Sequence, residues 1–306
     1  MGESIETQNN VADLWQYVER TKPQIEDALQ KFLPLAPPEI ETEFNRAIEY
    51  ALFPGGKRLR PVLTLLGAEL TGGRAQPVLP AAIAVEYIHT SSLIFDDLPA
   101  MDNASVRRGK KSLHLHFGEG LSLLVGIAFL NAAYGLVFVN HASMPERAVA
   151  AHAEIVECVG AGGMVGGQSL DLALAKGKSG AGEAASARSY ADESVRNLKT
   201  SALMRLALRI GAILAGADYL ELSALSRFAE LLGDAYQLSD DLLDLEEDGA
   251  LFNQKTFVLS RDAGSSQRQL RGLIEEAKRI LVENFPPSEA RSCLIQLTDY
   301  LAERKA

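Results

Sequence analysis

The sequence is poor in the residues that build disulfide-stapled or zinc-bound domains, with two cysteines and one tryptophan among 306 residues. Cys158 and Cys293 lie far apart in the chain and form no Cys-X-X-Cys pair. We therefore expect neither a disulfide framework nor a zinc site, and we expect a reducing, cytoplasmic compartment. Runs that alternate apolar and polar residues, as half-buried strands do, are essentially absent.

Basic residues are also scarce, because 30 Lys and Arg stand against 40 Asp and Glu, for a formal net charge of −10. Nucleic-acid binding proteins release counterions with a surplus of basic side chains, so this balance excludes general nucleic-acid binding. The 47% of hydrophobic residues suffices for a large core and excludes a disordered chain. Such an acidic protein binds an anionic substrate only where its few basic side chains converge.

One long uncharged run, residues 121–139, raises the question of a membrane helix. Its length would span a bilayer of about 30 Å, but polar and glycine residues interrupt it and no Lys/Arg cluster flanks it. The alternative is a helix buried on all sides at the centre of a bundle, which we favour, so we expect no membrane-spanning segment. The N-terminal stretch has four acidic residues before Arg20 and resembles neither a signal peptide nor a transit peptide.

Helical periodicity dominates the rest of the chain. Apolar residues recur with helical spacing in residues 11–32, 203–216 and 223–247, and proline-rich breaks at 33–38 and 285–287 indicate loops between helices. The small-residue segment 172–187 has the composition of a connection. No composition shift marks a second domain, so the sequence predicts one all-α domain over residues 1–306.

Two acidic clusters carry the strongest chemical signal. They lie more than a hundred residues apart and consist of Asp96, Asp97 and Asp102, and of Asp240, Asp241 and Asp244. Both stand among apolar residues, where crowded carboxylates repel one another unless a cation neutralises them. Mg²⁺ suits such sites because it takes oxygen ligands and bridges phosphates. Either cluster alone could instead be a solvated helix end.

Two basic runs interrupt the acidic background, at Gly55–Pro61 (GGKRLRP) and at Arg107–Lys111 (RRGKK). Glycine lets a backbone approach a phosphate closely, and arginine offers paired donors to its oxygens. The second run follows the first acidic cluster directly, so metal ligands and guanidinium groups could contact the same anion. A lone basic run would more often be a solvated surface.

Taken in order, these motifs resemble those of the trans-isoprenyl diphosphate synthases. The resemblance runs from about Ala47 to Lys255. It rests on FPGGKRLRP at 53–61, DDLPAMD at 96–102, RRG at 107–109, GQ at 167–168, DL at 171–172, KT at 199–200 and QLSDDLLD at 237–244. It implies an all-α bundle around a deep central cavity, the isoprenoid synthase type I fold, usually as a homodimer. The implied reaction joins isopentenyl diphosphate to an allylic diphosphate (dimethylallyl, geranyl or farnesyl).

The same resemblance implies roles for individual residues. The six aspartates Asp96, Asp97, Asp102, Asp240, Asp241 and Asp244 would hold about three Mg²⁺ ions. Arg107, Lys199 and Lys255 would contact the allylic diphosphate, while Gly56, Lys57, Arg60, His89 and Arg108 would bind isopentenyl diphosphate. Thr200 and Gln237 would lie near the ionising carbon, so that catalysis would depend on them together with Lys199, Asp96, Asp97, Asp102 and Asp240.

Two positions depart from the family pattern, because Phe95 stands where relatives commonly have His and Ile127 where they commonly have Asp. The loop between Asp244 and Lys255 is also short and lacks a further lysine. A shortened loop leaves open a non-catalytic partner subunit that modifies another synthase, and a terpene cyclase would share the fold. The two basic runs favour a synthase over a cyclase, which needs only one diphosphate site.

Product length in this family depends on the residue five positions before the first aspartate, which is Ser91 here. A large aromatic side chain there stops growth near fifteen carbons. A small serine predicts further growth, until Ile88 or Tyr87, one turn deeper, blocks the chain. The expected product is geranylgeranyl diphosphate, with twenty carbons, and a farnesyl product is the alternative.

Overall fold

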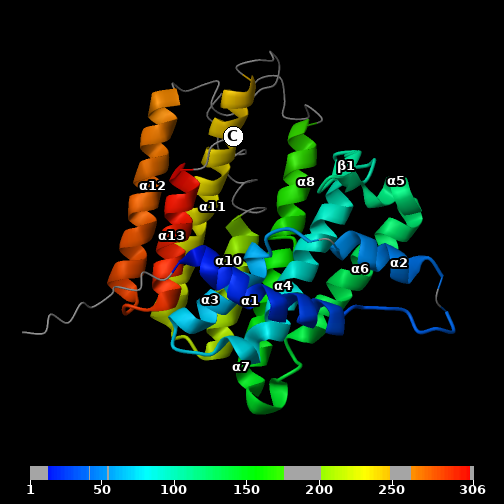
Figure 1. Cartoon of the computed structure of the whole chain (residues 1–306), viewed down its shortest axis with the longest axis horizontal. Helices are drawn as coiled ribbons and strands as arrows, with labels where there is room; N and C mark the ends of the chain where they lie inside the picture. The colour runs from blue at the N-terminus through cyan, green and yellow to red at the C-terminus, as the bar shows by residue number, and fades with distance from the viewer. Residues whose placement is uncertain (1–12, 41, 54, 176–200, 249–262, 304–306) are drawn as a thin grey trace, which may run out of the picture.

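The computed structural model describes residues 13–40, 42–53, 55–175, 201–248 and 263–303, which form a helical bundle with one small hairpin (Figure 1). In chain order the elements are α1 (Leu14–Lys31), α2 (Phe44–Leu52), α3 (Leu59–Leu70), α4 (Ala75–Asp96), β1 (Val106–Arg107), β2 (Lys110–Lys111), α5 (Leu113–Phe117), α6 (Glu119–Leu136), the 3-10 turn η1 (His141–Ser143), α7 (Pro145–Val159), α8 (Met164–Ala175), α10 (Ala202–Ala215), α11 (Tyr219–Asp248), α12 (Ala263–Asn284) and α13 (Glu289–Glu303). The predicted all-α class is confirmed. Helices α1, α10 and α11 coincide within a few residues with the periodic segments of the sequence.

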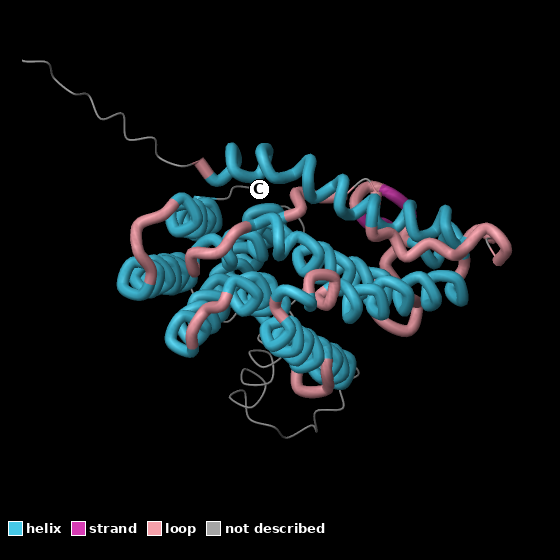
Figure 2. Tube along the Cα trace, turned by 90° about the horizontal axis from the view of Figure 1, so that it is seen from below, coloured by secondary structure: helices cyan, strands magenta, loops and turns pink. Residues whose placement is uncertain are grey.

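The centre of the bundle is α4, which packs against α1, α3, α6 and α10. Its apolar and small residues are spread around the whole helix, and buried side chains follow one another from Val78 to Ile88. A helix that is apolar on every side is stable only when it is enclosed. Most helices run roughly side by side around it, whereas α1 lies across one face of the bundle (Figures 1 and 2).

Two glycines allow α3 and α10 to approach each other closely. A Cβ atom on Gly67 of α3 would stand 2.2 Å from the carbonyl oxygen of Leu208, and one on Gly211 of α10 would stand 2.0 Å from that of Thr64. Any side chain at either position would force the two backbones apart. The short distance between α3 and α10 therefore depends on these two glycines. Helix α4 packs against both α3 and α10.

Helix α6 contains the uncharged run, and here the expectation of burial on all sides is wrong. One face packs on α4, through Val125 and Phe129, whereas Leu123, Leu124 and Ile127 are exposed. By length and composition, three helices of the described chain could cross a membrane, namely Ala75–Asp96, Glu119–Leu136 and Pro145–Ala173. Of these, α4 and not α6 is the enclosed central helix, because α6 lies at the edge of the bundle.

The hairpin β1–β2 is a second departure from the sequence expectation. Val106 pairs with Lys111 and Arg107 with Lys110, and the turn consists of Arg108 and Gly109, both with positive φ. Two consecutive residues with positive φ are typical of the tight turns that join antiparallel strands. The signal was weak because Arg-Gly is not the usual pair for such a turn, and each strand has only two residues.

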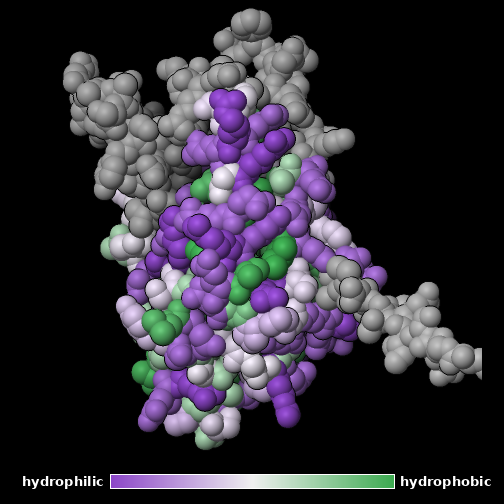
Figure 3. All heavy atoms as spheres, turned by 90° about the vertical axis from the view of Figure 1, so that its left-hand side faces the viewer, coloured by the Kyte–Doolittle hydropathy of each residue, from purple (hydrophilic) through white to green (hydrophobic). Residues whose placement is uncertain are grey.

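The surfaces of the bundle differ in polarity. The side of the molecule that carries α12 is mainly hydrophilic with small apolar areas (Figure 3). Charged side chains on this side pair with one another, as Arg227 does with Glu276 at 2.7 Å. The α6 side, by contrast, exposes large aliphatic side chains.

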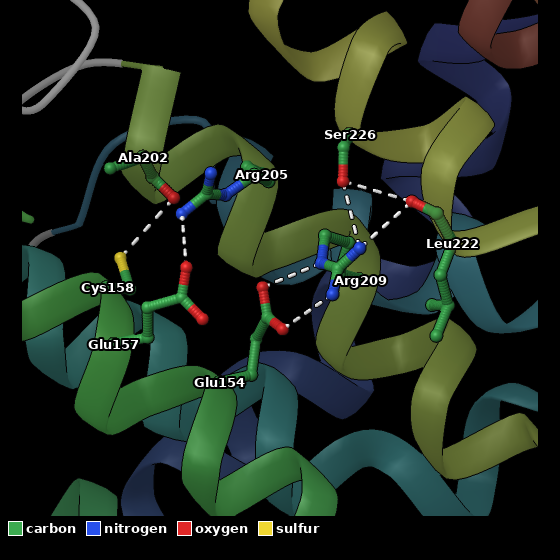
Figure 4. Close-up of polar contacts among 8 residues, drawn as sticks. All are labelled: Glu154, Glu157, Cys158, Ala202, Arg205, Arg209, Leu222 and Ser226. Atoms are coloured by element: carbon green, nitrogen blue, oxygen red, sulfur yellow. Dashed lines mark hydrogen bonds and ion pairs between the residues drawn. The ribbon is translucent and has the colours of Figure 1, made fainter. Parts of the chain in front are cut away.

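A polar cluster joins α7, α10 and α11 (Figure 4). The Arg209 guanidinium donates from Nε and Nη2 to the two carboxylate oxygens of Glu154, at 2.7 and 2.8 Å, and from Nη1 to the Leu222 carbonyl and the Ser226 hydroxyl. Glu154 is buried. Arg205 also reaches α7, at 3.4 Å from Glu157, but there the carboxylate is exposed.

This cluster gives a stability prediction. Arg209→Ala leaves the buried Glu154 without its partner, so we expect it to lower the free energy of unfolding in urea by about 3 kcal/mol. Arg205→Ala is the matched control, and removing its exposed pair should cost less than about 1 kcal/mol. Equal losses in the two variants would contradict this difference in burial.

Candidate active site

A cavity of about 510 Å³ lies along one face of α4. Its lining is mainly apolar and comes from α3, α4, α6, α7, α8, α10 and the loop after α4. The residues are Arg60, Ile88, His89, Ser91, Ser92, Leu93, Phe95, Asp96, Met101, Leu130, Val159, Met164, Val165, Gln168, Ser169, Leu172 and Leu203. The wall of this otherwise apolar space carries one cation, one carboxylate and one imidazole, which belong to Arg60, Asp96 and His89. Such a space can hold a hydrocarbon and a polar group together.

The first acidic motif is divided between two faces of α4. Asp96 lines the cavity, whereas the neighbouring Asp97 faces away and is almost completely buried. Arg107 of β1 donates from Nε to both Asp97 carboxylate oxygens, at 3.0 and 3.2 Å, and from Nη2 to one of them. These bonds raise the pKa of the Arg107 guanidinium. The pair was not foreseen, because two adjacent aspartates read alike in a sequence.

The loop after α4 folds back on the helix end. The Asp102 backbone N–H donates to the Asp96 carbonyl at 2.9 Å, and the Asn103 N–H donates to the Leu98 carbonyl at 3.1 Å. Asn103 takes a positive φ, which asparagine tolerates better than most residues. The turn thereby returns Asp102 to the end of α4, with its side chain exposed.

The three cationic side chains of the GGKRLRP run lie in different surroundings. Arg60 faces the cavity and donates from Nη1 to His89 Nε2 at 3.1 Å. Arg58 is instead a structural residue, because its buried guanidinium pairs with Glu26 at 2.8 Å and Glu86 at 2.7 Å. Arg58 had no role assigned from the sequence, and its buried pairs with Glu26 and Glu86 were not foreseen.

Lys57 of the same run is held by aromatic rings. Its ammonium lies 5.1 Å from the ring centroids of both Trp15 and Tyr300, and it donates to the Tyr300 hydroxyl at 2.9 Å. Gly56 beside it is exposed, with nothing near the position of a Cβ atom. Neither residue lines the cavity, and the aromatic partners come from the first and last described helices.

His89 is neutral in this setting. Burial lowers its pKa well below the ordinary value, and the nearby guanidinium groups of Arg60, Arg108 and Arg107 lower it further. The imidazole accepts from Arg60 through Nε2, so the remaining proton belongs on Nδ1. Burial also lowers the pKa of the Arg60 guanidinium, whose Nε has no hydrogen-bond partner among the described residues. An anion entering the cavity would supply that partner.

The second acidic motif lies on α11, where Gln237 and Asp240 are half-buried. The side chains of Asp241 and Asp244 lie outside the described part of the structure, as do Lys199, Thr200 and Lys255. Among the described residues, no three His, Cys, Asp or Glu side chains are grouped to hold a metal ion. The six-aspartate metal site therefore stays a prediction. Carboxylate oxygens are ligands that suit a hard cation such as Mg²⁺. In the first motif Asp96 faces the cavity, whereas Asp97 is already paired with Arg107.

The predicted chain-length positions fall into two groups. Ser91 and Ile88 line the cavity, as the helical spacing predicts. Tyr87 does not, because its ring packs on Phe129 with centroids 5.1 Å apart and its hydroxyl donates to the Leu29 carbonyl at 3.2 Å. One residue on a helix turns the side chain by about 100°, which directs Tyr87 toward α1 and α6.

Phe95 is a cavity residue whose position sequence reasoning did not explain. A Cβ atom on Gly126 of α6 would stand 2.7 Å from two ring carbons of Phe95, so the absence of a side chain at 126 leaves room for the ring. Phe95 also lines the cavity. The place of this ring, and with it the width of the cavity, thus depends on a glycine of the neighbouring helix.

The amino-acid sequence of this chain is similar to those of known proteins. The family model for polyprenyl synthetases matches residues 41–258. A geranylgeranyl diphosphate synthase of Cyanophora paradoxa is 39% identical over 240 residues, covering 76% of this chain and 75% of its own. A dimethylallyltranstransferase of Fischerella ambigua is 34% identical and covers 94% of this chain and 83% of its own.

Solved structures show the same fold. An FPP/GFPP synthase from Zymomonas mobilis superposes with a TM-score of 0.82 at 27% identity, covering 94% of this chain and 98% of its own. A geranyltransferase from Legionella pneumophila gives a TM-score of 0.81 at 30% identity, covering 96% of this chain and 98% of its own.

The neutral imidazole of His89 gives a pH prediction. Below the ordinary histidine pKa near 6.5, the unfolded chain takes up a proton that the folded chain refuses, so stability falls as the pH drops through this range. Glutamine offers Arg60 an acceptor but does not titrate. Between pH 7 and pH 5, His89→Gln should therefore lose about 1 kcal/mol less unfolding free energy than the parent.

The control for this experiment is His116→Gln, because the His116 ring is exposed and stacks on Tyr50. It should keep the pH dependence of the parent in urea unfolding. An unchanged pH dependence in His89→Gln would show that His89 titrates normally.

Proposed function

The chain belongs to the polyprenyl synthetase family, and from this premise we propose that it is a trans-prenyltransferase that makes geranylgeranyl diphosphate. The enzyme condenses isopentenyl diphosphate with an allylic diphosphate, which is dimethylallyl, geranyl or farnesyl diphosphate. The observation that carries the proposal is the cavity of about 510 Å³, whose apolar wall continues past the small Ser91 and whose polar wall holds Arg60, His89 and Asp96.

The chain's own groups divide the work of this reaction. Cationic side chains, Arg60 among them, bind the diphosphates, and the unpartnered Arg60 Nε is a donor for one of them. The apolar walls hold the hydrocarbon and keep water from the allylic cation that forms when the carbon–oxygen bond breaks. The double bond of isopentenyl diphosphate attacks that cation and a carbon–carbon bond forms. The new cation then loses a proton to the released diphosphate, which restores a double bond. Neutral His89 keeps the Arg60 guanidinium directed into the cavity.

Enzymes of this family generally use Mg²⁺. We propose that Asp96 and Asp102, with Asp240, Asp241 and Asp244 of α11, hold about three such ions. Asp97 would contribute through its pair with Arg107 instead. When bound, the ions would stabilise the negative charge that develops on the departing diphosphate.

The exposed face of α6 supports a homodimer. Leu123, Leu124 and Ile127 present a stripe of aliphatic side chains on an enzyme whose α12 side is mainly hydrophilic. Because contiguous exposed apolar patches mark interaction surfaces, we propose that a second copy of the chain covers this one and that no helix spans a membrane. The two free cysteines, both buried, suit a cytoplasmic location.

Product length tests the proposed reaction. The purified chain, given Mg²⁺, isopentenyl diphosphate and dimethylallyl diphosphate, should form a C20 product in reverse-phase chromatography after dephosphorylation. Ser91→Phe fills the cavity and should shift the main product to C15. Gly126→Ala should also shorten the product, because its Cβ pushes the Phe95 ring into the cavity.

The matched control is Gly120→Ala on the same helix, where a Cβ atom meets nothing within 4 Å. It should leave the product at C20. A C15 product from the parent chain would make it a farnesyl diphosphate synthase. A hydrocarbon formed from geranylgeranyl diphosphate alone would make it a cyclase, and no turnover by the purified chain would favour a partner subunit.

The oligomer is tested at the exposed face. Leu124→Glu introduces a charge at the centre of the stripe and should convert a dimer into a monomer in sedimentation velocity, without loss of helical content. Val282→Glu, an exposed aliphatic position on α12, should leave the dimer intact. A parent chain that sediments as a monomer, or one extracted only with detergent, would contradict the proposed interface.

A further inference from the structure

Phe95 carries the one benzene ring on the wall of the large cavity within the described part of the chain. It is half-buried, directly precedes Asp96 at the end of α4, and lies about one helical turn above Ser91, which lines the same wall. The other aromatic side chain of the wall is the imidazole of His89, which already bonds to Arg60. Among the described lining residues, Phe95 therefore has the one aromatic ring that no polar partner occupies.

The ring of Phe95 is held at both ends. Its base belongs to α4, and a Cβ atom on Gly126 of α6 would stand 2.7 Å from Cε1 and from Cζ, the atoms at its tip. The ring thus reaches from α4 to α6, two helices that pack against each other. With base and tip both placed against helices, the ring meets a molecule in the cavity along the surface between them.

The reacting end of an allylic diphosphate would pass this ring. In the proposed reaction Asp96 holds a metal ion on the diphosphate, and the hydrocarbon continues past Ser91. These two residues are five positions apart, which is about 7.5 Å along a helix axis. The carbon bonded to the diphosphate oxygen and the neighbouring double bond would therefore lie between the two levels, which is where Phe95 lines the wall.

Positive charge that forms at this level has few partners on the cavity wall. Asp96 is the one carboxylate among the described lining residues, and a metal ion would take up its charge. Arg60 is itself a cation, and neutral His89 directs the lone pair of its Nε2 at Arg60. Most of the remaining side chains are apolar. A cation in such surroundings has lost its contact with water, so the negative face of an aromatic ring stabilises it more than it would in water.

We propose that Phe95 is a catalytic residue of the proposed prenyl transfer, on which this inference rests, and that the face of its ring stabilises the allylic cation. When the carbon–oxygen bond breaks, its electron pair leaves with the diphosphate, and the first and third carbons of the allylic group share the positive charge. The ring forms no bond and exchanges no proton, so it is unchanged when isopentenyl diphosphate adds. This role would distinguish the chain from relatives that have His at this position.

Fluorination of the Phe95 ring tests this role with little change in the shape of the wall. Fluorine withdraws electron density from the ring face and weakens its attraction for a cation. The full-length chain is made with one or two fluorine atoms on the ring carbons nearest Cβ, away from the tip that rests on Gly126. A single turnover with Mg²⁺, geranyl diphosphate and isopentenyl diphosphate is followed by rapid quenching. Its rate should fall with each fluorine, by about fivefold in total.

A cationic inhibitor tests the same contact by binding alone. An analogue of geranyl diphosphate with a protonated amine in place of the third carbon carries the charge of the allylic cation. Its dissociation constant should rise with fluorination of Phe95 as the rate falls, because both depend on attraction between the ring and a cation. An unreactive thiolo analogue, which is uncharged at that carbon, should bind as it does to the parent chain.

The matched control is the same fluorination at Phe117, a half-buried ring of α5 that packs on Tyr50 and does not line the cavity. It should leave the rate and both dissociation constants unchanged. The inference is overturned if fluorination of Phe95 leaves the rate or the binding of the amine analogue unchanged, or if it weakens both analogues equally. A parent chain that makes no product would contradict the proposed function instead, and the amine analogue would still report whether the ring binds a cation.

Discussion

The enclosure of α4 on every side is the constraint on which the rest of the structure depends. Because the helix cannot rotate within its neighbours, each residue near its end has a fixed direction. His89 and Asp96, seven residues apart, face the large cavity, and Thr90 and Asp97, also seven apart, face a hollow of about 50 Å³ between α4 and the β1–β2 hairpin. The close approach of α3 and α10 completes the enclosure of the helix. The two faces of one helix thus present different side chains to two different spaces.

Charge at the site is balanced locally and bears little relation to the net charge of −10. Arg107 neutralises Asp97, and Glu26 and Glu86 neutralise Arg58, so these charges are already committed within the fold. The groups that remain for ligands are those whose partners are incomplete, such as Arg60, whose Nε has no hydrogen-bond partner among the described residues. A buried polar group that lacks a hydrogen-bond partner, beside a cavity, therefore marks a place where a substrate or ion would bind.

The sequence predicted the all-α class and the main helices, because helical periodicity depends on local geometry. The predicted site residues that line the cavity are Arg60, Ile88, His89, Ser91 and Asp96. The sequence could not tell Asp96 from Asp97, because the direction of a side chain depends on what packs around its helix. The run 121–139 was placed at the centre because apolarity alone does not distinguish an enclosed helix from one with an exposed face. The Phe95–Gly126 contact joins two helices and has no local signal.

The central claim is that the large cavity beside α4 holds the growing hydrocarbon chain. A crystal structure with an unreactive thiolo analogue of farnesyl diphosphate and Mn²⁺, in which anomalous scattering locates the metal, tests it most directly. We predict the hydrocarbon tail in this cavity, against Ser91 and Phe95, and a metal beside Asp96. A tail bound outside the cavity, with the space beside Ser91 unfilled, would contradict the account.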